Sequence, residues 1–261
     1  MKKPFVAVLV PFKGEIDYLI SMVNSFLSSY VSGFAYTISL WDDGSTDDEL
    51  VKLWDSIPRQ VQIIRHKNVG YTQQVWNMIH FGKHENRFDY LLVCNSDTKM
   101  RKGSFHAMVK RMMSNNNIFA VGGKVLRYDT DIILHTGTRI KNGEIEDPYC
   151  GLNKNDPVSN KVERRLWVNG CCTLYNLDAM RNADLNVDFE FTPAYFEEAD
   201  LMTRANMLGY SCIYEPKAEI DHVMNATMGK ERDKYGQIFW GNWEKYLSKW
   251  KPHFRSDALA F

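Results

Sequence analysis

The chain has 261 residues, 44% of them hydrophobic, which is enough apolar material for one large α/β domain or for a core domain with a small appendage. Its 32 basic residues balance 32 acidic residues, so the formal net charge is zero. This balance excludes a chain-wide electrostatic field of the kind that binds nucleic acid, although a local basic face stays open.

Cysteine usage and the amino terminus indicate a cytoplasmic protein. The five cysteines form an odd set with no C-x-x-C pair and no zinc-type spacing: Cys94, Cys150, Cys171, Cys172 and Cys212. Reduced thiols are therefore expected, as in the cytosol. The apolar run that ends at Pro11 is shorter than a signal-peptide core or a membrane span, so no transmembrane segment is expected there.

The first hundred residues alternate short apolar runs with amphipathic segments, a pattern typical of parallel strands joined by crossover helices. Strands are expected at residues 5–10, 36–41, 61–65 and 90–94, and helices at residues 16–27, 46–54 and 71–81. The second of these helices begins with a capping box, Thr46 followed by Glu49. In such sheets ligands bind at the carboxyl ends of the strands, so polar residues at those ends are the first candidates for chemistry.

Beyond Gly103 the pattern becomes mixed. A helix is expected at residues 105–112, a strand at 119–126 and a hairpin turn at Asn142-Gly143. Residues 141–161 are rich in Asn, Asp, Gly and Lys, which indicates a long surface loop. A helical stripe that includes Leu201 ends at Gly209, a natural C-cap.

Two acidic clusters follow strand ends. Asp42 and Asp43 come directly after the second strand, and Asp97 comes directly after the fourth. Carboxylates alone would repel a diphosphate, but a divalent cation can take oxygen ligands from both. Each cluster taken singly also has a structural interpretation, because such sequences form good turns and helix caps.

The order of the motifs is more informative than any one of them. The motifs are Val10-Pro11-Phe12, Trp41-Asp42-Asp43-Gly44-Ser45-Thr46-Asp47, Asn68-Val69-Gly70 with Asn77, Leu92-Val93-Cys94-Asn95-Ser96-Asp97-Thr98, Trp167-Val168-Asn169-Gly170, Tyr195-Phe196-Glu197-Glu198-Ala199-Asp200-Leu201 with Arg204 and Gly209-Tyr210, and Tyr214-Glu215-Pro216 before His222. This series resembles the family 2 glycosyltransferases of GT-A fold, in particular the bacterial rhamnosyltransferase-like branch. The resemblance implies an α/β fold with a Rossmann-like mixed sheet flanked by helices.

The resemblance also implies a site for a nucleotide-sugar donor and a metal ion. The implied donor-binding residues are Pro11, Phe12, Asp42, Asp43, Asn68, Gly70, Asn95 and Ser96, with Asp43 reading the nucleotide base. Asp97 matches the metal-binding acid of the family's D-x-D motif, and His222 matches a histidine that can complete the metal site in relatives, where the ion is expected to be Mn²⁺ or Mg²⁺. A surface or structural histidine is the alternative for His222. The first acid of D-x-D is Asn95 here, which leaves the cation one strong carboxylate.

A carboxylate at the start of the 197–209 helix is the expected general base. An inverting transfer needs a carboxylate to accept the proton of the attacking hydroxyl. Glu198 aligns with the family's usual Asp and is the first choice, with Glu197 beside it as the other candidate. The helix dipole favours ionised carboxylates in the first turn, so ordinary helix-terminal acids are the structural alternative.

The acceptor side and the tail are less defined by sequence. Trp167, Asn169, Gly170 and Asp200 are assigned to the acceptor and sugar pocket, although core packing is an equal alternative for Trp167, and Asp200 is also expected to pair with Arg204. We divide the chain into a catalytic domain at 1–229, with a nucleotide part to about 100 and an acceptor part after it, and an aromatic, basic, helical extension at 230–261. Three interpretations of the extension compete: a helix docked on the core, a helix near lipid-linked acceptors, and a contact with nucleic acid.

The expected function is an inverting, metal-dependent hexosyl- or pentosyltransferase. Its donor would be a UDP- or dTDP-sugar, and its acceptor a hydroxyl of a free or lipid-linked saccharide. Three alternatives stay open: a phage-type enzyme that glycosylates modified DNA bases, a nucleotidyltransferase, and a sugar- or nucleotide-binding module without catalysis. A nucleotidyltransferase would normally carry a Gly-rich phosphate loop after the first strand, and Pro11-Phe12-Lys13-Gly14 is too sparse for one.

Overall fold

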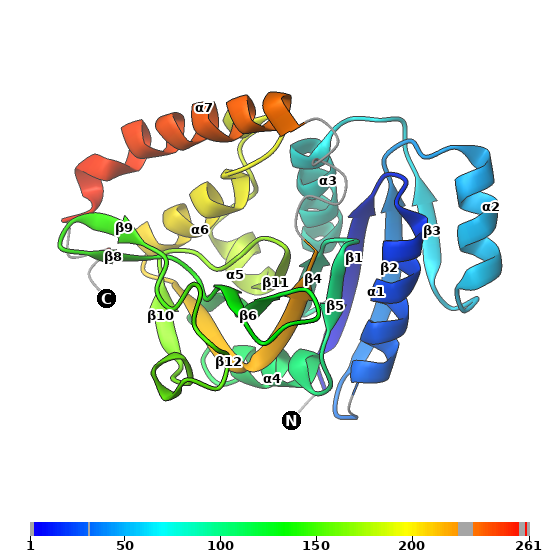
Figure 1. The fold of residues 1–261 in the computed structure, drawn as a ribbon, viewed down its shortest axis with the longest axis horizontal. Coiled ribbons are helices and arrows are strands. Elements are labelled where there is room, and N and C mark those ends of the chain that lie inside the picture. Colours follow the sequence, from blue (N-terminus) through cyan, green and yellow to red (C-terminus); the bar gives the residue numbers. More distant parts are fainter. Residues whose placement is uncertain (1–2, 31, 224–231, 256–258, 260–261) are drawn as a thin grey trace.

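The nucleotide half of the chain has the expected parallel α/β architecture. The structure is a computed structural model, and it describes residues 3–30, 32–223, 232–255 and 259. The strands are β1 (Phe5–Phe12), β2 (Ala35–Asp42), β3 (Gln62–Arg65) and β4 (Tyr90–Cys94), and the helices between them are α1 (Ile16–Ser29), α2 (Asp47–Ser56) and α3 (Tyr71–His84). The four strands pair in parallel in the order β4-β1-β2-β3 (Figure 1). The expected elements are confirmed, including the capping box at Thr46 and Glu49.

The second half extends the same sheet with antiparallel and parallel strands. Its elements are β5 (Thr98–Met100), α4 (Ser104–Met112), β6 (Ile118–Arg127), β7 (Ile133–His135), β10 (Glu163–Arg165), β11 (Cys172–Asn176), α5 (Leu177–Asn182), α6 (Glu197–Met207) and β12 (Ser211–His222). Strand β11 joins the halves, because it pairs antiparallel with both β4 and β6. In the described part of the chain the sheet order is therefore β10-β12-β6-β11-β4-β1-β2-β3, with β5 and β7 attached at β12 and β6. The expected fold class, a mixed sheet flanked by helices, is confirmed.

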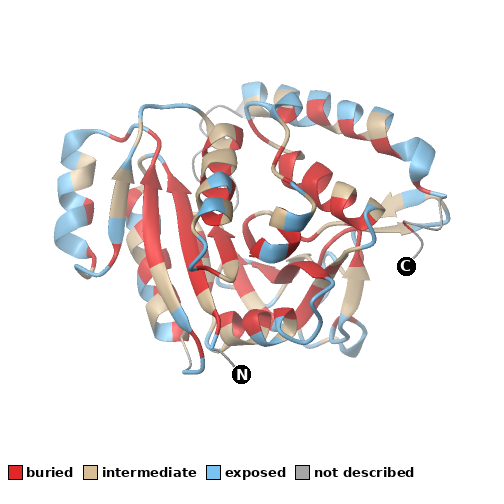
Figure 2. Ribbon diagram, turned by 180° about the vertical axis from the view of Figure 1, so that it is seen from behind, coloured by how far each residue is buried: buried red, intermediate tan, exposed pale blue. Residues whose placement is uncertain are grey.

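Both faces of the sheet are buried, as the near-continuous apolar strands require. Side chains alternate along β1: Val6 and Val8 belong to the cluster under α1 and α4, whereas Ala7 and Leu9 belong to the cluster under α3 and α5. Figure 2 shows the strands buried between two helical layers. A sheet packed on both sides is a rigid platform, so the residues at its strand ends are held in fixed positions.

The stretch after β7 is more ordered than the sequence indicates. A hairpin, β8 (Arg139–Lys141) and β9 (Glu144–Glu146), turns at Asn142 and Gly143, whose φ angles of 55° and 80° fit a two-residue turn. The predicted hairpin is confirmed. The prediction of a single loop over residues 141–161 is wrong in part, because this stretch contains β9 and a 3₁₀ turn at Pro157–Ser159.

The carboxyl-terminal helix α7 (Arg232–Trp250) packs on α6, which confirms the docked-helix interpretation for the described part of the extension. Tyr246 is fully buried, and its hydroxyl lies 2.6 Å from the Thr203 hydroxyl. The Trp250 indole donates to Asp200 at 2.9 Å, and the Lys249 ammonium lies 2.9 Å from the same carboxylate. Residues 230–231, 256–258 and 260–261 of the predicted extension lie outside the described residues.

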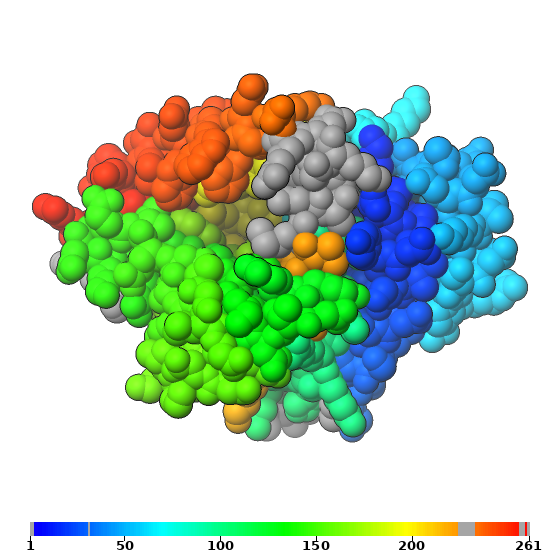
Figure 3. Space-filling view, in the orientation of Figure 1, coloured from blue at the N-terminus to red at the C-terminus, as the bar shows by residue number. Residues whose placement is uncertain are grey.

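Helix α7 crosses one edge of the molecule and stays at its surface in the space-filling view (Figure 3). A short 3₁₀ turn (Lys251–His253) follows it. Within the described ranges, none of the helices has the length and apolar character needed to cross a bilayer.

We predict that Asp200→Ala lowers the free energy of unfolding by about 3 kcal/mol, because it leaves the α6–α7 contact without its buried anion. The Asp200 carboxylate is fully buried and also accepts from Arg204 at 2.8 Å. Urea unfolding followed by tryptophan fluorescence measures the change. The matched control is Asp178→Ala, which removes an exposed pair with Arg181 and should change stability by less than about 1 kcal/mol. Equal losses in the two variants would contradict the anchoring role of Asp200.

Candidate functional site

Parallel pairing brings the polar strand ends to one edge of the sheet. Phe12 at the end of β1 pairs in register with Asp42 at the end of β2, and β4 lies on the other side of β1 and ends at Cys94. Pro11 and Phe12 are buried in the sheet, whereas Asn95 and Asp97 after β4 are partly exposed. The strands β2 and β4 flank β1, and one acidic cluster follows each of them. Both clusters therefore lie at the same edge of the sheet, as the sequence predicts.

Asp43 holds the segment that leads into α3. Its carboxylate accepts hydrogen bonds from the backbone amides of Val69 at 2.7 Å and Gly70 at 3.1 Å. The side chains of Asn68 and Gln74 approach the same carboxylate at 3.4 Å. Since a carboxylate has about four acceptor positions, this segment occupies the group fully. Its predicted contact with a nucleotide base stays a prediction, and in this conformation Asp43 shapes the loop at residues 68–70.

Asp42 lies beneath the surface and orders the turn that follows β2. The side chain is fully buried and accepts from the Ser45 amide at 2.8 Å. Ser45 in turn accepts from the Gly14 amide at 2.9 Å, which ties the loop after β1 to the loop after β2. The Arg65 guanidinium lies 3.7 Å from the second carboxylate oxygen. Asp42 therefore stabilises the loops after β1 and β2, which contain candidate donor-binding residues.

Tyr71 connects the loop after β4 with the acidic start of α6. Its hydroxyl lies 3.1 Å from Asn95 Oδ1 and 2.9 Å from Glu198 Oε1. Tyr71 is the first residue of α3 and follows Gly70, whose amide Asp43 holds. One short segment thus links Asp43, Asn95 and Glu198, which belong to three different parts of the sequence. Sequence reasoning missed Tyr71, and the only signal was a tyrosine at the first helical position after an expected ligand loop.

Asp97 and His222 form a pair at the junction of β5 and β12. His222 Nε2 lies 3.2 Å from Asp97 Oδ1, and Thr98 and His222 pair across the two strands. Burial lowers the pKa of His222, but contacts with Cys171 and Asp97 outweigh burial and raise it well above its usual range. Burial raises the pKa of the Cys171 thiol, and the other group in contact with the imidazole is the Asp97 carboxyl.

The pair fits part of a divalent-cation site. Carboxylate oxygen and imidazole nitrogen are both ligands that Mn²⁺ accepts, and the two side chains are partly exposed, at 13% and 15%. Among the described residues, no cluster of three His, Cys, Asp or Glu side chains could hold a metal by itself. A cation at this point would therefore need further oxygen ligands, which a diphosphate can supply.

The two adjacent glutamates at the start of α6 have different environments. Glu197 is fully buried, and within the described residues no geometric hydrogen bond reaches either of its carboxyl oxygens. Burial, and then the adjacent Glu198, raise its pKa well above the usual range. Glu198 is held by Tyr71 and lies against Gly170, where an added Cβ would come within 2.7 Å of its carboxylate. Glu198 is therefore the member of the pair whose carboxylate has a fixed hydrogen-bond donor.

The predicted acceptor residues separate into two groups. Asn169 and Gly170 lie in the loop before β11, where the Asn169 side chain accepts from the Cys171 amide at 2.8 Å and Gly170 meets Glu198. Trp167 packs at an angle of 72° on Tyr246 of α7, with ring centroids 5.1 Å apart. The structure corrects the assignment of Asp200 to a sugar pocket, because its buried carboxylate binds Arg204, Lys249 and Trp250 instead. The predicted pair with Arg204 is confirmed.

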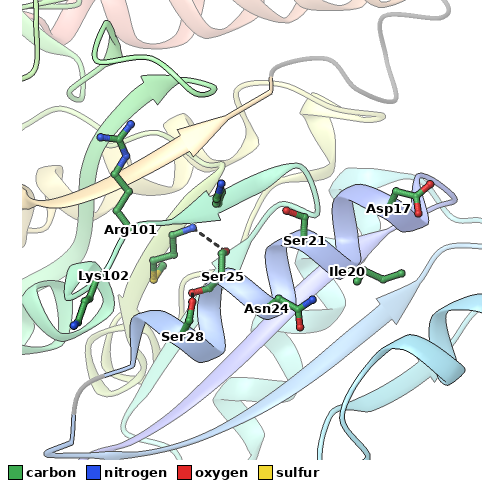
Figure 4. A pocket seen from close by; sticks show the side chains of 10 residues that line it. Asp17, Ile20, Ser21, Asn24, Ser25, Ser28, Arg101 and Lys102 are labelled. Carbon is green, nitrogen blue, oxygen red and sulfur yellow. Dashed lines mark hydrogen bonds between the residues drawn. The ribbon is translucent and has the colours of Figure 1, made fainter.

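One open groove in the described part of the chain lies outside this cluster. It is an open groove of about 840 Å³ between α1 and β5, lined by Ser21, Asn24, Ser25, Lys99 and Lys102 among others (Figure 4). It begins next to Thr98 but contains none of the predicted donor or metal residues. The candidate site is therefore defined by its hydrogen-bonded side chains and not by the volume of a groove.

We predict that Glu197→Gln stabilises the protein progressively as pH rises above about 4.5. Because the folded-state pKa of Glu197 is raised, the folded protein keeps a proton that the unfolded chain releases, and wild-type stability falls with pH by about 1.4 kcal/mol per unit from this group. The neutral amide does not release that proton. Melting temperatures from pH 4 to 8 test the prediction, with Glu190→Gln on the exposed surface as control. A constant difference across this range would contradict it.

Comparisons with known proteins identify the family and the fold. A family model described as glycosyl transferase family 2 matches residues 7–168, well over half of the chain. A crystal structure of GalNAc-T7 with UDP, GalNAc and Mn²⁺ is similar, with a TM-score of 0.63 and 16% sequence identity over 85% of this chain and 44% of that chain. At this identity the likeness shows the GT-A fold alone, and this chain spans less than half the length of that protein. Among curated proteins, none matches significantly. On the family match, supported by motif order and fold, the chain belongs to glycosyl transferase family 2.

Proposed function

We propose that this glycosyltransferase is an inverting, metal-dependent enzyme that moves a sugar from a UDP- or dTDP-type donor to a saccharide hydroxyl. The observation that carries the proposal is the junction at residues 95–97. Asn95 is joined through Tyr71 to Glu198, and Asp97, two residues further on, is paired with His222. A candidate base and a candidate metal pair therefore face the same short loop.

Glu198 is proposed as the general base. It lies in the first turn of α6, where the helix dipole favours a carboxylate, and Tyr71 fixes its oxygen at 2.9 Å. The carboxylate accepts the proton of the acceptor hydroxyl while that oxygen attacks the anomeric carbon. A single base on the side opposite the leaving diphosphate supports inversion of configuration.

Asp97 and His222 are proposed to hold Mn²⁺ or Mg²⁺ together with the diphosphate. The bound cation would stabilise charge on the departing diphosphate. The GalNAc-T7 structure contains UDP and Mn²⁺, which supports the choice of donor and ion by likeness of fold. A neutral Asn95 beside Asp97 leaves one carboxylate for the cation, as expected of the rhamnosyltransferase-like branch.

The loops after β1, β2 and β3 are proposed to bind the nucleotide. Pro11 and Phe12 end β1, and Asp43 fixes the loop that presents Asn68 and Gly70. Ser96 lies between Asn95 and Asp97, where it is partly exposed and close to the proposed diphosphate. Residues 1 to about 100 would then be the donor part of a catalytic domain at 1–229, with Trp167, Asn169 and Gly170 on the acceptor side.

Nucleotide binding tests the donor and metal assignments together. Calorimetric titration with UDP, dTDP and GDP, with and without Mn²⁺, should give tighter binding of a uridine or thymidine diphosphate when Mn²⁺ is present. Asp97→Asn should weaken the metal-dependent part of binding at least tenfold, whereas Asp178→Asn on the far helix α5 should not. Binding that is indifferent to metal would rule out the assignment, and binding without turnover would favour a non-catalytic module.

Glu198→Gln tests catalysis. The amide keeps the shape of the side chain and cannot accept the proton, so kcat for transfer or donor hydrolysis should fall by roughly 10² to 10⁴-fold. Nucleotide affinity should stay near that of the wild type. Normal turnover by this variant would show that Glu198 is not the base.

Gly170→Ala tests the position of the same carboxylate. The added Cβ would lie 2.7 Å from Glu198 Oε1, so the carboxylate must move away from Tyr71. We expect kcat to fall roughly tenfold, the size of one displaced hydrogen bond to a charged group, with little change in melting temperature. The control Gly236→Ala adds a methyl group to open space on α7 and should leave kcat unchanged. Unchanged kcat in both variants would contradict a fixed Glu198.

A further inference from the structure

The Tyr71 hydroxyl has one hydrogen and two acceptors. It lies 2.9 Å from Glu198 Oε1 and 3.1 Å from Asn95 Oδ1, and a phenol can donate to only one of them fully. Burial, and then the charges of Glu198 and Glu197, raise the pKa of Tyr71 well above its usual range, so the hydroxyl keeps its hydrogen. The direction of this hydrogen depends on which acceptor is stronger.

An ionised carboxylate is a stronger acceptor than an amide oxygen. While Glu198 is ionised, the hydrogen therefore points to Glu198. After Glu198 has taken a proton, its carboxylic acid is a weaker acceptor, and the amide of Asn95 becomes the better partner. Rotation about one C–O bond is enough to change partner, because the ring itself is fixed at the start of α3.

We propose that Tyr71 is a positioning residue that senses the protonation of Glu198 and transmits it to the donor loop through Asn95. The proposal rests on Glu198 being the base of the proposed function. In the ionised state Tyr71 orients the carboxylate for proton transfer. After sugar transfer Glu198 is protonated, and the hydroxyl hydrogen of Tyr71 turns to Asn95. Asn95 lies two residues before Asp97, in the loop proposed to hold the metal and the diphosphate.

The departure from the family's D-x-D motif fits this arrangement. An aspartate at position 95 would compete with Glu198 for the Tyr71 hydrogen and would place another negative charge beside Glu197 and Glu198. The neutral amide of Asn95 accepts the Tyr71 hydrogen only when Glu198 is protonated. Among the described residues, Tyr175 of β11 also faces Glu198, and burial raises the pKa of Tyr175 well above its usual range, so it stays neutral.

Tyr71→Phe removes the hydroxyl and keeps the ring. The ionised Glu198 then loses its donor, so the acidic limb of the kcat/KM profile should move to higher pH, and kcat on the plateau should fall roughly 10- to 100-fold. The donor KM should change less than threefold, because no donor contact is assigned to Tyr71. The control Tyr246→Phe also removes a buried hydroxyl, 2.6 Å from Thr203 in the α7 contact, and should keep the wild-type profile.

A double-mutant comparison tests the link to Asn95. Asn95→Ala removes the competing acceptor, so the acidic limb should move to lower pH when Tyr71 is present and should not move in the Tyr71→Phe background. A Tyr71→Phe profile that superimposes on the wild type would overturn the proposal. An Asn95→Ala shift of equal size in both backgrounds would overturn it as well, because the link would then bypass Tyr71.

Infrared titration separates this proposal from the proposed function. The carboxylate band that disappears in Glu198→Gln belongs to Glu198, and its midpoint should rise in Tyr71→Phe whether or not the protein turns over a sugar nucleotide. If the midpoint of the Glu198 band rises in Tyr71→Phe but the wild-type protein transfers no sugar, the coupling between Tyr71 and Glu198 is supported and the enzyme assignment is refuted. An unchanged midpoint in an active enzyme would refute the coupling alone.

Discussion

The start of α3 is the constraint on which the site depends. The amides of Val69 and Gly70 are held by the Asp43 carboxylate, and the next residue, Tyr71, reaches Asn95 and Glu198. A carboxylate at a helix start satisfies amides that have no partner within the helix, and it interacts favourably with the helix dipole. Because these contacts are consecutive along the chain, fixing Asp43 also fixes the direction of Tyr71.

The sheet makes this arrangement possible because it is packed on both faces. The loops after β1, β2 and β4 emerge from a platform with two apolar clusters, so their polar residues meet without needing long flexible connections. Strand β11 adds the second half of the molecule to β4 and carries the Asn169-Gly170 loop to the same edge. The two halves of the chain therefore share one continuous sheet.

Three acids in the first turn of α6 have three different environments. Glu197 is fully buried and its pKa is raised, Glu198 is held by Tyr71, and Asp200 binds α7 through Lys249 and Trp250. The carboxyl-terminal helix thus braces α6 from one side while Tyr71 and Gly170 hold Glu198 from the other. A buried carboxyl with a raised pKa is expected to cost stability as pH rises, and such costs are often found at functional sites.

The sequence by itself determined the elements and the approximate place of the site, because hydrophobic periodicity, the Thr46 capping box and the Asn142-Gly143 turn are local signals. It also placed Asp42, Asp43 and Asp97 at strand ends, since parallel strands share an edge. Only the tertiary structure decided what each acid does. Tyr71 contacts Glu198 across 127 residues of sequence, and Asp200 binds Trp250 of α7, because burial and partners at long sequence separation fix a side chain's role. No local pattern contains that information.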